Sequence, residues 1–566
     1  MVTTCPIRDI LRTPSGGTKL VMFDVVVANG IVVDGTGVRG AHRADVGVID
    51  DVIVAVAPAG TLSGASVIDA SGRHVMPGFI DIHTHYDAQV LWDPSLSPSS
   101  HQGVTTVIGG NCGFTLAPCK PEHRSVVIDT LESVEDMSAA TLHEGIEWSF
   151  TTFDEYLQTL EHKGVGLNYA SYVGHTALRL WVMGDEAHER EATSREISDM
   201  CAVAAEALSV GAVGISTDRS RFHRGAGGRR VPSAIASTDE MEALVRCAAA
   251  HDRVVETNPD DEFAWLYEVA ARTGCAITWT ALVTYPDDNA ARTHWTAKRR
   301  THREGWAAGA RVYPQVTCRP LSVQLSLLNP TPFIGAPAFK ELMALPTADR
   351  PSLYRDTAWR ARARDELASE RFHQVRWSSI LVAETTEAEL LGRDLASLAT
   401  EMQLDPFDAL VEIALRDDLT TRCTMIVGND NAEGVTELLS EPGCLLGISD
   451  AGAHVGMLCD AGMPVEFLAL WVRDRGVMSL ERAVHRLTGE PAAFFGLHKR
   501  GTVTEGAHAD LVVLDLAHLT PSPLRRVYDL PAGGDRLVAD QVVGIDHVLV
   551  NGRPRAERGG RVLRTV

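Results

Sequence analysis

The sequence lacks any uncharged apolar run long enough to cross a bilayer, which takes about 20 residues, and Met1 to Val21 lack the apolar core of a signal peptide. The ten cysteines are scattered with no Cys-x-x-Cys pair, which disfavours a disulfide framework and indicates reduced thiols. No basic stripe offsets the net charge of −22, and such an acidic chain repels nucleic-acid phosphates and anionic lipids. We therefore predict a cytoplasmic protein that acts on a small molecule, with no nucleic-acid or membrane partner and with a homo-oligomer left open.

The bulk composition is that of a folded protein larger than one compact module. The chain has 566 residues, of which 45% are hydrophobic and 22% are charged. This length predicts one large domain with a smaller satellite.

Short β-rich segments lie at both ends of the chain. Residues 22–75 contain apolar bursts separated by Asn29-Gly30 and Asp50-Asp51, which are typical of turns between paired strands. A similar pattern returns in residues 496–566, for example in the apolar run that ends at Leu514. Each segment alone is too short to bury a good core, so we predict that they pair into one small β domain, a β-sandwich.

Residues 76–495 alternate apolar strands with longer amphipathic stretches, the pattern of βα units around a parallel sheet. Eight such units predict a closed (β/α)8 TIM-type barrel, whose active site lies at the C-terminal ends of its strands. The candidate strands end near His85, Asn111, His175, Thr217, Asn258, Thr280, Gln315 and Asp450.

Two long interruptions break the alternation, Asp287 to Gly305 and Pro320 to Arg376. A long excursion inside a barrel is more often an active-site cover than a plain connection. We predict a lid insertion around residues 283–376 that includes both.

The clearest motif is Pro-Gly-Phe-Ile-Asp-Ile-His-Thr-His, which ends at His85. Because residues i and i+2 of a strand share a face, His83 and His85 point the same way and can bind one cation. The alternative is two polar residues in a loop. An apolar strand directly before the pair favours the metal site.

Two further strand ends carry candidate groups. Cys112 stands between glycines in Gly-Gly-Asn-Cys-Gly, where an exposed thiolate could approach a metal, although a small buried turn residue is the alternative. Asp450 ends the apolar run from Leu446 and could bind the metal while accepting a proton from water. Its alternative is a turn or helix cap.

Two histidines give weaker signals. His175 ends the third strand, where a metal ligand, a substrate contact and a hydrogen-bonded structural histidine are all open. His454 follows the eighth strand and could line the site, although loop histidines are mostly solvated.

These segments together resemble the N-acyl-D-amino-acid deacylases of the amidohydrolase superfamily. The resemblance rests on PGFIDIHTH, GGNCGFTLAPC, YVGHTALR and LGISDAG, and on the C-terminal KRGTVTEGAHADLVVLD. It implies a zinc-binding barrel, a catalytic aspartate at Asp450, and Cys112 in place of the carbamylated lysine used elsewhere in the superfamily. The absence of lysine between Lys163 and Lys298 agrees with that role for Cys112.

The chain departs from the resemblance at two places. The family has a metal-binding histidine at the end of each of strands five and six, where this chain has Asn258 and Trp279 or Thr280. An amide oxygen is a poor zinc ligand and an indole is none, so one ion is expected rather than two. The arginine that clamps the substrate carboxylate after the catalytic aspartate is absent from Ala451 to Asp460. The nearby cations that remain are Arg319, Arg219 and Arg221.

We therefore predict a metal-dependent hydrolase of a non-peptide amide C–N bond, with Asp450 as general base. The predicted zinc ligands are His83, His85, Cys112, Asp450 and His175, and the predicted substrate contacts are Asn258, Trp279, Tyr313, Arg319 and His454. One alternative is the same barrel acting on a carbamate, cyclic amide or other bond. Another is a degenerate, non-catalytic homologue, which has no physical need for the retained ligands.

Overall fold

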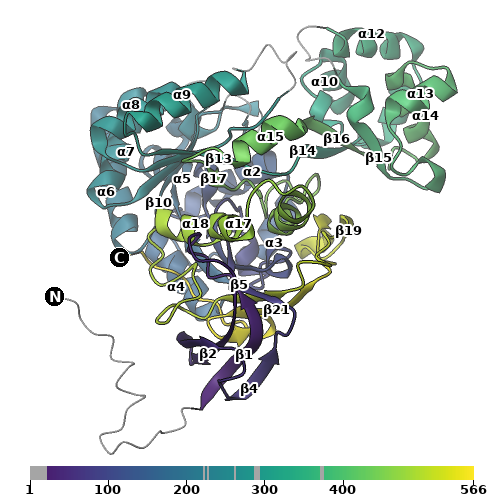
Figure 1. Cartoon of the computed structure of the whole chain (residues 1–566). Helices are drawn as coiled ribbons and strands as arrows, with labels where there is room; N and C mark the ends of the chain where they lie inside the picture. The colour runs from purple at the N-terminus through teal and green to yellow at the C-terminus, as the bar shows by residue number, and fades with distance from the viewer. Residues whose placement is uncertain are drawn as a thin grey trace, which may run out of the picture.

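The computed structural model describes residues 22–220, 223–225, 228–259, 263–285, 294–369 and 375–565. Figure 1 shows a small β domain below a central barrel, and a helical lobe that projects from one side of the barrel.

The small β domain is built from both ends of the chain, as the sequence predicts. Its main sheet runs in the order β22-β21-β18-β5-β1-β2-β3, with β4 paired to β1. The C-terminal strand β18 pairs antiparallel with the N-terminal β5 through Leu511 and Pro77. Alternate apolar residues such as Val27, Val75 and Val513 point into one shared core, because neighbouring residues of a strand face opposite sides. The strands are β1 Phe23–Val32, β2 His42–Ile49, β3 Val52–Pro58, β4 Gly64–Asp69, β5 His74–Pro77, β18 Leu511–Leu514, β21 Ile545–Val550 and β22 Arg553–Pro554, with the separate pair β19 Arg525–Val527 and β20 Arg536–Val538.

Eight parallel strands close the barrel, which confirms the predicted fold class. β6 pairs with β7 and β7 with β8, while β9 to β13 and β17 form one parallel sheet; β8 and β9 lie on either side of Tyr172 and together make the third strand. The barrel closes where Thr84 bridges Ala451, beside the hydrogen bond from His85 N–H to the Ala451 carbonyl (2.7 Å). The strands are β6 Phe79–Asp81, β7 Val104–Gly109, β8 Asn168–Ser171, β9 Val173–Gly174, β10 Gly214–Asp218, β11 Val254–Asn258, β12 Ile277–Trp279, β13 Val312–Val316 and β17 Leu445–Leu446.

Helices surround these strands. Two of them begin with capping boxes, Thr152 with Glu155 and Thr193 with Glu196, in which each side chain bonds the backbone N–H of the other residue. The helices are α2 Arg124–Glu135, α3 Ala139–Gly145, α4 Phe153–Lys163, α5 His175–Met183, α6 Ser194–Ser209, α7 Thr238–Ala250, α8 Phe263–Thr273, α9 Trp295–Ala307, α15 Ala432–Leu439, α16 Met463–Glu466, α17 Leu480–Leu487 and α18 Gly489–Phe494, with a π-helix at Phe467–Asp474.

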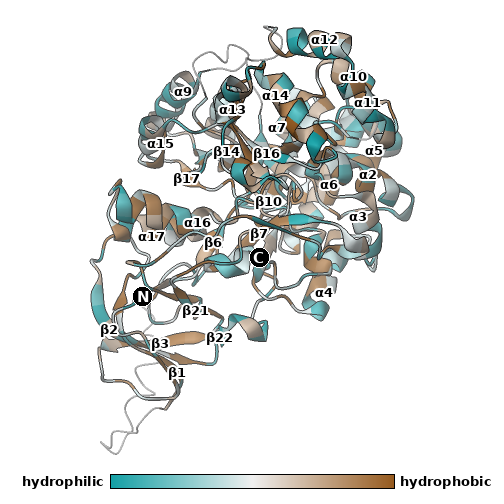
Figure 2. Cartoon of the chain, turned by 90° about the vertical axis from the view of Figure 1, so that its right-hand side faces the viewer, coloured by the Kyte–Doolittle hydropathy of each residue, from teal (hydrophilic) through white to brown (hydrophobic). Residues whose placement is uncertain are grey.

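The lobe at the side of the barrel has a hydrophobic core of its own. Its three-stranded sheet, β14-β16-β15, is covered by helices around Phe339, Trp359 and Phe407. In Figure 2 the lobe helices α10 and α14 carry both hydrophobic and hydrophilic colour, as helices with one buried side do. Its elements are β14 Leu321–Ser326, α10 Pro337–Met343, α11 Arg350–Tyr354, α12 Thr357–Leu367, β15 Ile380–Glu384, α13 Leu395–Met402, α14 Pro406–Arg416 and β16 Arg422–Gly428.

The lobe differs in extent from the lid predicted at 283–376. It runs on to β16, because β16 is the middle strand of its sheet. Of the first interruption, residues 287–293 lie outside the described part of the chain, and α9 packs on α8 and β13 as part of the barrel wall. The lobe contacts the loop after the eighth strand, where Gln324 N–H donates to the Met457 carbonyl (2.7 Å). Its role as a lid stays a prediction.

Among the described residues, no helix is long and apolar enough to cross a lipid bilayer. The nine cysteines in that part of the chain are all free thiols.

Candidate metal centre

Three side chains meet at the C-terminal ends of the first two barrel strands. One ligand atom each from His83, His85 and Cys112 lies within 4.8 Å of the others, and all three residues are buried. The Nε2 atom of His83 is 3.6 Å from Cys112 Sγ. Asp450, from the eighth strand, places Oδ1 at 3.2 Å from His83 Nε2 and 3.8 Å from His85 Nε2. The structure therefore brings four of the five predicted ligands together.

The second ring nitrogen of each histidine is held by another side chain. His83 Nδ1 lies 3.0 Å from Gln315 Oε1, and His85 Nδ1 lies 3.2 Å from Glu135 Oε1. An acceptor at Nδ1 keeps the proton there and turns the lone pair of Nε2 toward the shared point. Histidines that bind metals almost always have such a partner.

Cys112 is presented by a strained turn. Its φ of 54° lies in the left-handed region, which is uncommon for a residue with a β-carbon. Its N–H donates to Glu256 Oε2 at 2.8 Å, so a carboxyl from the fifth strand fixes this conformation. Gly113 is needed beside it, because a β-carbon there would lie 3.1 Å from the Thr217 backbone.

Asp450 is also in the left-handed region, with φ 43°. The hydroxyl of the preceding Ser449 lies within hydrogen-bond distance of two acceptors, Asp81 Oδ1 (2.8 Å) and the His83 carbonyl (2.9 Å). These bonds tie the eighth strand to the first, so the two strand ends hold Asp450 against the histidines.

The electrostatics of the cluster match a cation-binding site. Burial lowers the pKa of His83 to about 4, so its ring is neutral and has a lone pair to share. Burial opposes the charge on Asp450, but its contact with His85 and the other neighbouring histidines together outweigh burial and hold the pKa of that carboxyl below its ordinary value. Burial raises the pKa of the Cys112 thiol well above its usual range, so binding of a metal there would release a proton.

The donor set fits a divalent ion of the zinc type. Two imidazole nitrogens and a thiol, all buried and converging, are ligands that zinc prefers. The side chain of Asp450 is 30% exposed, so the cluster is reachable from solvent.

His175, predicted as a ligand, lies outside this cluster. It is fully buried, with Nδ1 2.8 Å from Thr217 Oγ1 and Nε2 2.7 Å from Glu240 Oε1. Arg179 also pairs with Glu240, and neither Arg179 nor Glu240 is exposed. Both ring nitrogens are occupied, so His175 belongs to a buried polar network behind the third and fourth strands.

His175→Ala is expected to lower the free energy of unfolding by about 2–4 kcal/mol, because it removes two buried hydrogen bonds and leaves a cavity. The metal content of the folded fraction should not change. Denaturant unfolding and elemental analysis of the same preparation test this. A variant that loses its metal while keeping wild-type stability would contradict it.

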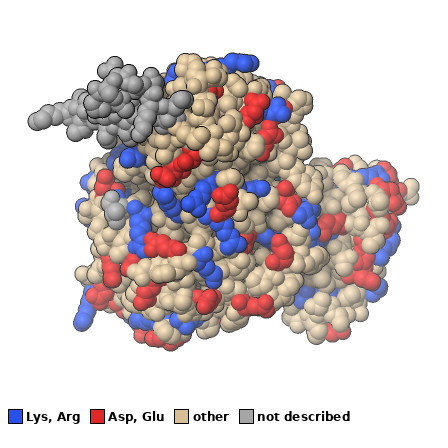
Figure 3. Space-filling view, turned by 90° about the horizontal axis from the view of Figure 1, so that it is seen from below, with Lys and Arg blue, Asp and Glu red and all other residues tan. Residues whose placement is uncertain are grey.

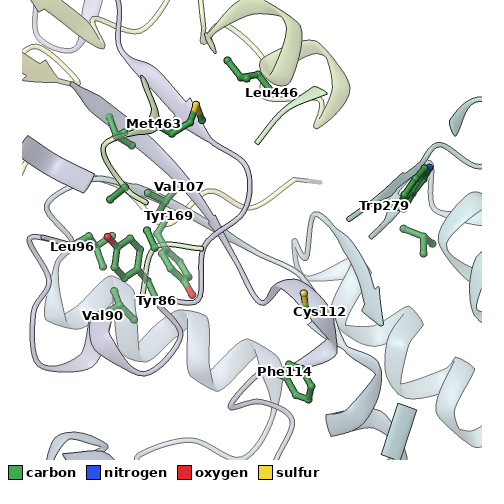
Figure 4. Close-up of a cluster of buried hydrophobic side chains, with 14 of the residues drawn as sticks. Tyr86, Val90, Leu96, Val107, Cys112, Phe114, Tyr169, Trp279, Leu446 and Met463 are labelled. Atoms are coloured by element: carbon green, nitrogen blue, oxygen red, sulfur yellow. The ribbon is translucent and has the colours of Figure 1, made fainter. Parts of the chain in front are cut away.

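Trp279, predicted as a substrate contact, faces the helices. Its ring is fully buried, stacks on Phe263 of α8 at 5.8 Å, and directs Nε1 to the Tyr267 hydroxyl (3.4 Å). Figure 4 shows Trp279 lying apart from Cys112. Because neighbouring strand residues face opposite sides, Thr280 is the residue of this strand end that faces the barrel interior.

Tyr313 and Arg319 are also placed differently from their prediction as substrate contacts. Tyr313 packs in the lower layer of the barrel interior, against Trp306 and Phe494 with ring centroids 5.0 and 4.9 Å apart. Arg319 is buried, and its guanidinium pairs with Asp460 Oδ1 (2.9 Å) and with Glu466. Two carboxylates therefore neutralise the arginine that could have held a substrate carboxylate.

The two remaining predicted contacts stay near the centre. Asn258 is half-buried at the end of β11, on the same face as Glu256. The backbone N–H of His454 donates to the Glu135 carbonyl at 2.5 Å. Its half-buried ring interacts electrostatically with the carboxylates of Glu135 and Asp450. Of the other cations considered, Arg219 donates to the Ala236 carbonyl, and Arg221 lies outside the described residues.

Sequence reasoning missed four polar residues that lie around the cluster. Gln315 and Glu256 could have been found as polar residues on the inner face of apolar strands. Glu135 is the last residue of α2 and has no local signal. His223 was also missed; its Nδ1 lies 2.5 Å from Asp218 Oδ2, and although burial opposes its charge, Asp218 raises its pKa to about 9.

A separate cavity of about 480 Å³ lies at the opposite end of the barrel and does not reach these residues. Its lining includes Arg253, Arg311 and Arg561, of which Arg561 pairs with Asp51. On the face shown in Figure 3, basic and acidic side chains lie intermixed, so it has no broad field of one sign. We assign the chemistry to the strand ends around His83.

Comparison with known proteins decides the family. The model of the amidohydrolase family matches residues 66–323 and 389–556, which is most of the chain. The chain belongs to the amidohydrolase family. The break in the match, residues 324–388, lies within the side lobe, whose last two helices and strand β16 are inside the match.

Among its relatives, this amidohydrolase is 30% identical to an uncharacterised protein of Mycobacterium tuberculosis, over 89% of this chain and 86% of the relative. It is 28% identical to a D-aminoacylase of Alcaligenes xylosoxydans xylosoxydans, over 96% of this chain and 97% of the relative. Its structure is similar to that of an N-acyl-D-glutamate deacylase from Bordetella bronchiseptica complexed with zinc and a phosphonate inhibitor, with TM-score 0.67 and 26% identity over 96% and 100% of the chains. Another similar structure is that of a D-aminoacylase with a binuclear metal centre, described by one-metal activation and second-metal attenuation. Its TM-score is 0.66, with 27% identity over 96% of this chain and 100% of the D-aminoacylase chain. The chain is thus an amidohydrolase that acts on non-peptide C–N bonds.

Proposed function

We propose that this amidohydrolase removes the acyl group from an N-acylated small molecule by metal-dependent hydrolysis of its amide bond. One observation carries the proposal: His83, His85 and Cys112 converge within 4.8 Å, with the Asp450 carboxylate beside them. A degenerate binding protein has no need to keep a proton acceptor in contact with both histidines.

We infer that His83, His85 and Cys112 hold one zinc ion, with Asp450 next to it as a further ligand and as the base. Zinc, when held by these residues, would supply a water with a lowered pKa at neutral pH. The zinc in the Bordetella bronchiseptica deacylase and the one-metal activation of D-aminoacylase support this assignment. Gln315 and Glu135 keep the two imidazoles oriented, and Glu256 keeps the Cys112 turn in place.

The proton steps fall to Asp450. Its lowered pKa keeps Oδ1 ionised at neutral pH, so it can accept a proton from the attacking water. The same carboxyl then gives that proton to the leaving amine. Its left-handed backbone and the Ser449 hydrogen bonds hold it in place for both transfers.

On the substrate side we assign contacts to Asn258 and His454, which stand beside the cluster. Arg319 takes no part, because Asp460 and Glu466 already neutralise it. We expect the enzyme to work in the cytoplasm, where its thiols stay reduced.

A second candidate keeps the barrel and the ion but acts on a cyclic amide or a carbamate. Two observations favour a cyclic amide or a carbamate over an N-acyl-D-amino acid as the substrate. Asn258 and Thr280 replace histidines expected from the resemblance, and the paired Arg319 offers no charge to a substrate carboxylate.

The test is a hydrolysis panel with the protein expressed in zinc-supplemented medium. The panel contains N-acetyl-D-amino acids with acidic, amide and apolar side chains, N-acetyl amines without a carboxylate, and cyclic amides. We expect turnover of at least one class, abolished by a chelator and restored by zinc. Turnover that survives complete removal of metal would contradict the proposal.

A further inference from the structure

The positions where the resemblance requires a second set of metal ligands do not suit a second ion. On the fifth and sixth strands the interior residues are Asn258 and Thr280, and the seventh strand contributes Gln315. An amide and a hydroxyl are poor ligands for zinc. Asn258, Thr280 and Gln315 are better suited to hydrogen bonds with a polar ligand.

The three strands place these side chains at one level. Thr257 pairs with Trp279 and Trp279 with Pro314, so the next residues, Asn258, Thr280 and Gln315, lie side by side. The N–H of Thr280 continues this pairing by donating to the Thr257 carbonyl (3.0 Å). Gln315 contacts His83, and Glu256 contacts the backbone of Cys112, so this face is the one that lines the centre.

Three buried polar atoms on this face have no hydrogen-bond partner among the described residues. They are Gln315 Nε2, Thr280 Oγ1 and Glu256 Oε1. An unpaired buried polar group destabilises the fold, so such groups are rare and call for an explanation. Two of the three residues use their other polar atom to hold a metal ligand. These unpartnered atoms point to a polar group bound beside the metal centre.

The chemistry of these atoms defines the group. Gln315 Nε2 can only donate, so it needs an acceptor such as a carbonyl oxygen. Glu256 Oε1 can accept an N–H, and the Thr280 hydroxyl can do either. Asp450 near this face is a carboxylate, and Arg319 is already paired with Asp460, so neither side chain offers a positive charge to an anion.

We propose that Gln315, Thr280 and Glu256 form a polar cradle that binds a neutral amide, ureido or imide edge of the substrate in place of a second metal ion. The carbonyl of that edge faces Gln315 and its N–H faces Glu256. This inference rests on the proposed hydrolase function and names the substrate class, a molecule with such an edge next to the scissile bond.

The test measures binding rather than turnover. Titration calorimetry of the zinc-loaded protein uses three probes: succinimide, N-methylsuccinimide, which keeps both carbonyls but lacks the N–H, and succinate. We expect succinimide to bind about 5- to 20-fold more tightly than the other two, as one or two hydrogen bonds predict. Equal affinity for succinimide and N-methylsuccinimide, or no binding of succinimide, would overturn the proposal.

Two variants test whether the Thr280 hydroxyl contributes to the affinity for succinimide. Thr280→Val keeps the shape and removes the hydroxyl, and should weaken succinimide binding about 5-fold. Thr257→Val is the matched control, because its Oγ1 is also buried and unpartnered, whereas Thr257 lines a different pocket, together with Met241 and Leu266. Equal losses in the two variants, or two tightly held ions per chain, would also overturn the proposal. Because no turnover is needed, failure of the hydrolysis panel alone would count against the proposed function and not against the cradle.

Discussion

Asp450→Asn is expected to lower kcat/KM by about 10³-fold on any substrate of this enzyme, within the range that a positioned proton acceptor contributes. An asparagine amide has nearly the same shape but cannot take the proton that Oδ1 accepts. The three donors from His83, His85 and Cys112 remain, so the variant should still carry its ion. The measurement is steady-state kinetics with elemental analysis of the same sample.

Asp129→Asn is the matched control for this substitution, because Asp129 lies exposed on α2. Its kcat/KM should stay within twofold of wild type. If Asp450→Asn kept more than a tenth of wild-type activity while holding its metal, another group would have to be the base.

His83→Ala and His85→Ala are each expected to reduce the metal content from about one ion per chain to less than about a tenth. Each removes a nitrogen donor from a set of three, and the residual pair binds zinc far more weakly. Cys112→Ser should also weaken binding sharply, because a hydroxyl is a much poorer ligand than a thiolate. Inductively coupled plasma analysis after dialysis gives the ion content, and thermal melts check the fold.

The control for these variants is His162→Ala, an exposed histidine on α4, which should leave the ion content unchanged. Glu135→Gln should weaken metal binding without abolishing it, since loss of a carboxylate behind a ligating histidine lowers the metal affinity about 10- to 100-fold. A His83→Ala protein with a full ion would show that the ion sits elsewhere.

The sequence by itself determined the barrel, the small β domain and most of the candidate cluster. Strand periodicity is local, so His83 and His85 had to share a face, and an apolar run ending in a polar residue identified the strand ends at Cys112 and Asp450. Closure of the barrel then brings the C-terminal ends of its strands together at one rim. The β-rich ends had to pair because neither could bury a core alone.

Only the tertiary structure decided which polar residues at those ends face the centre. A period of two shows that Trp279 and Thr280 face opposite sides, but packing against Phe263 of α8 decides which one points outward. The partners that remove Arg319 and His175 from the site, Asp460 and Glu240, are 141 and 65 residues away in the chain. A local pattern has no information about such distant partners. It is the three-dimensional packing that pairs one buried charge with another, because an unpaired charge cannot stay buried.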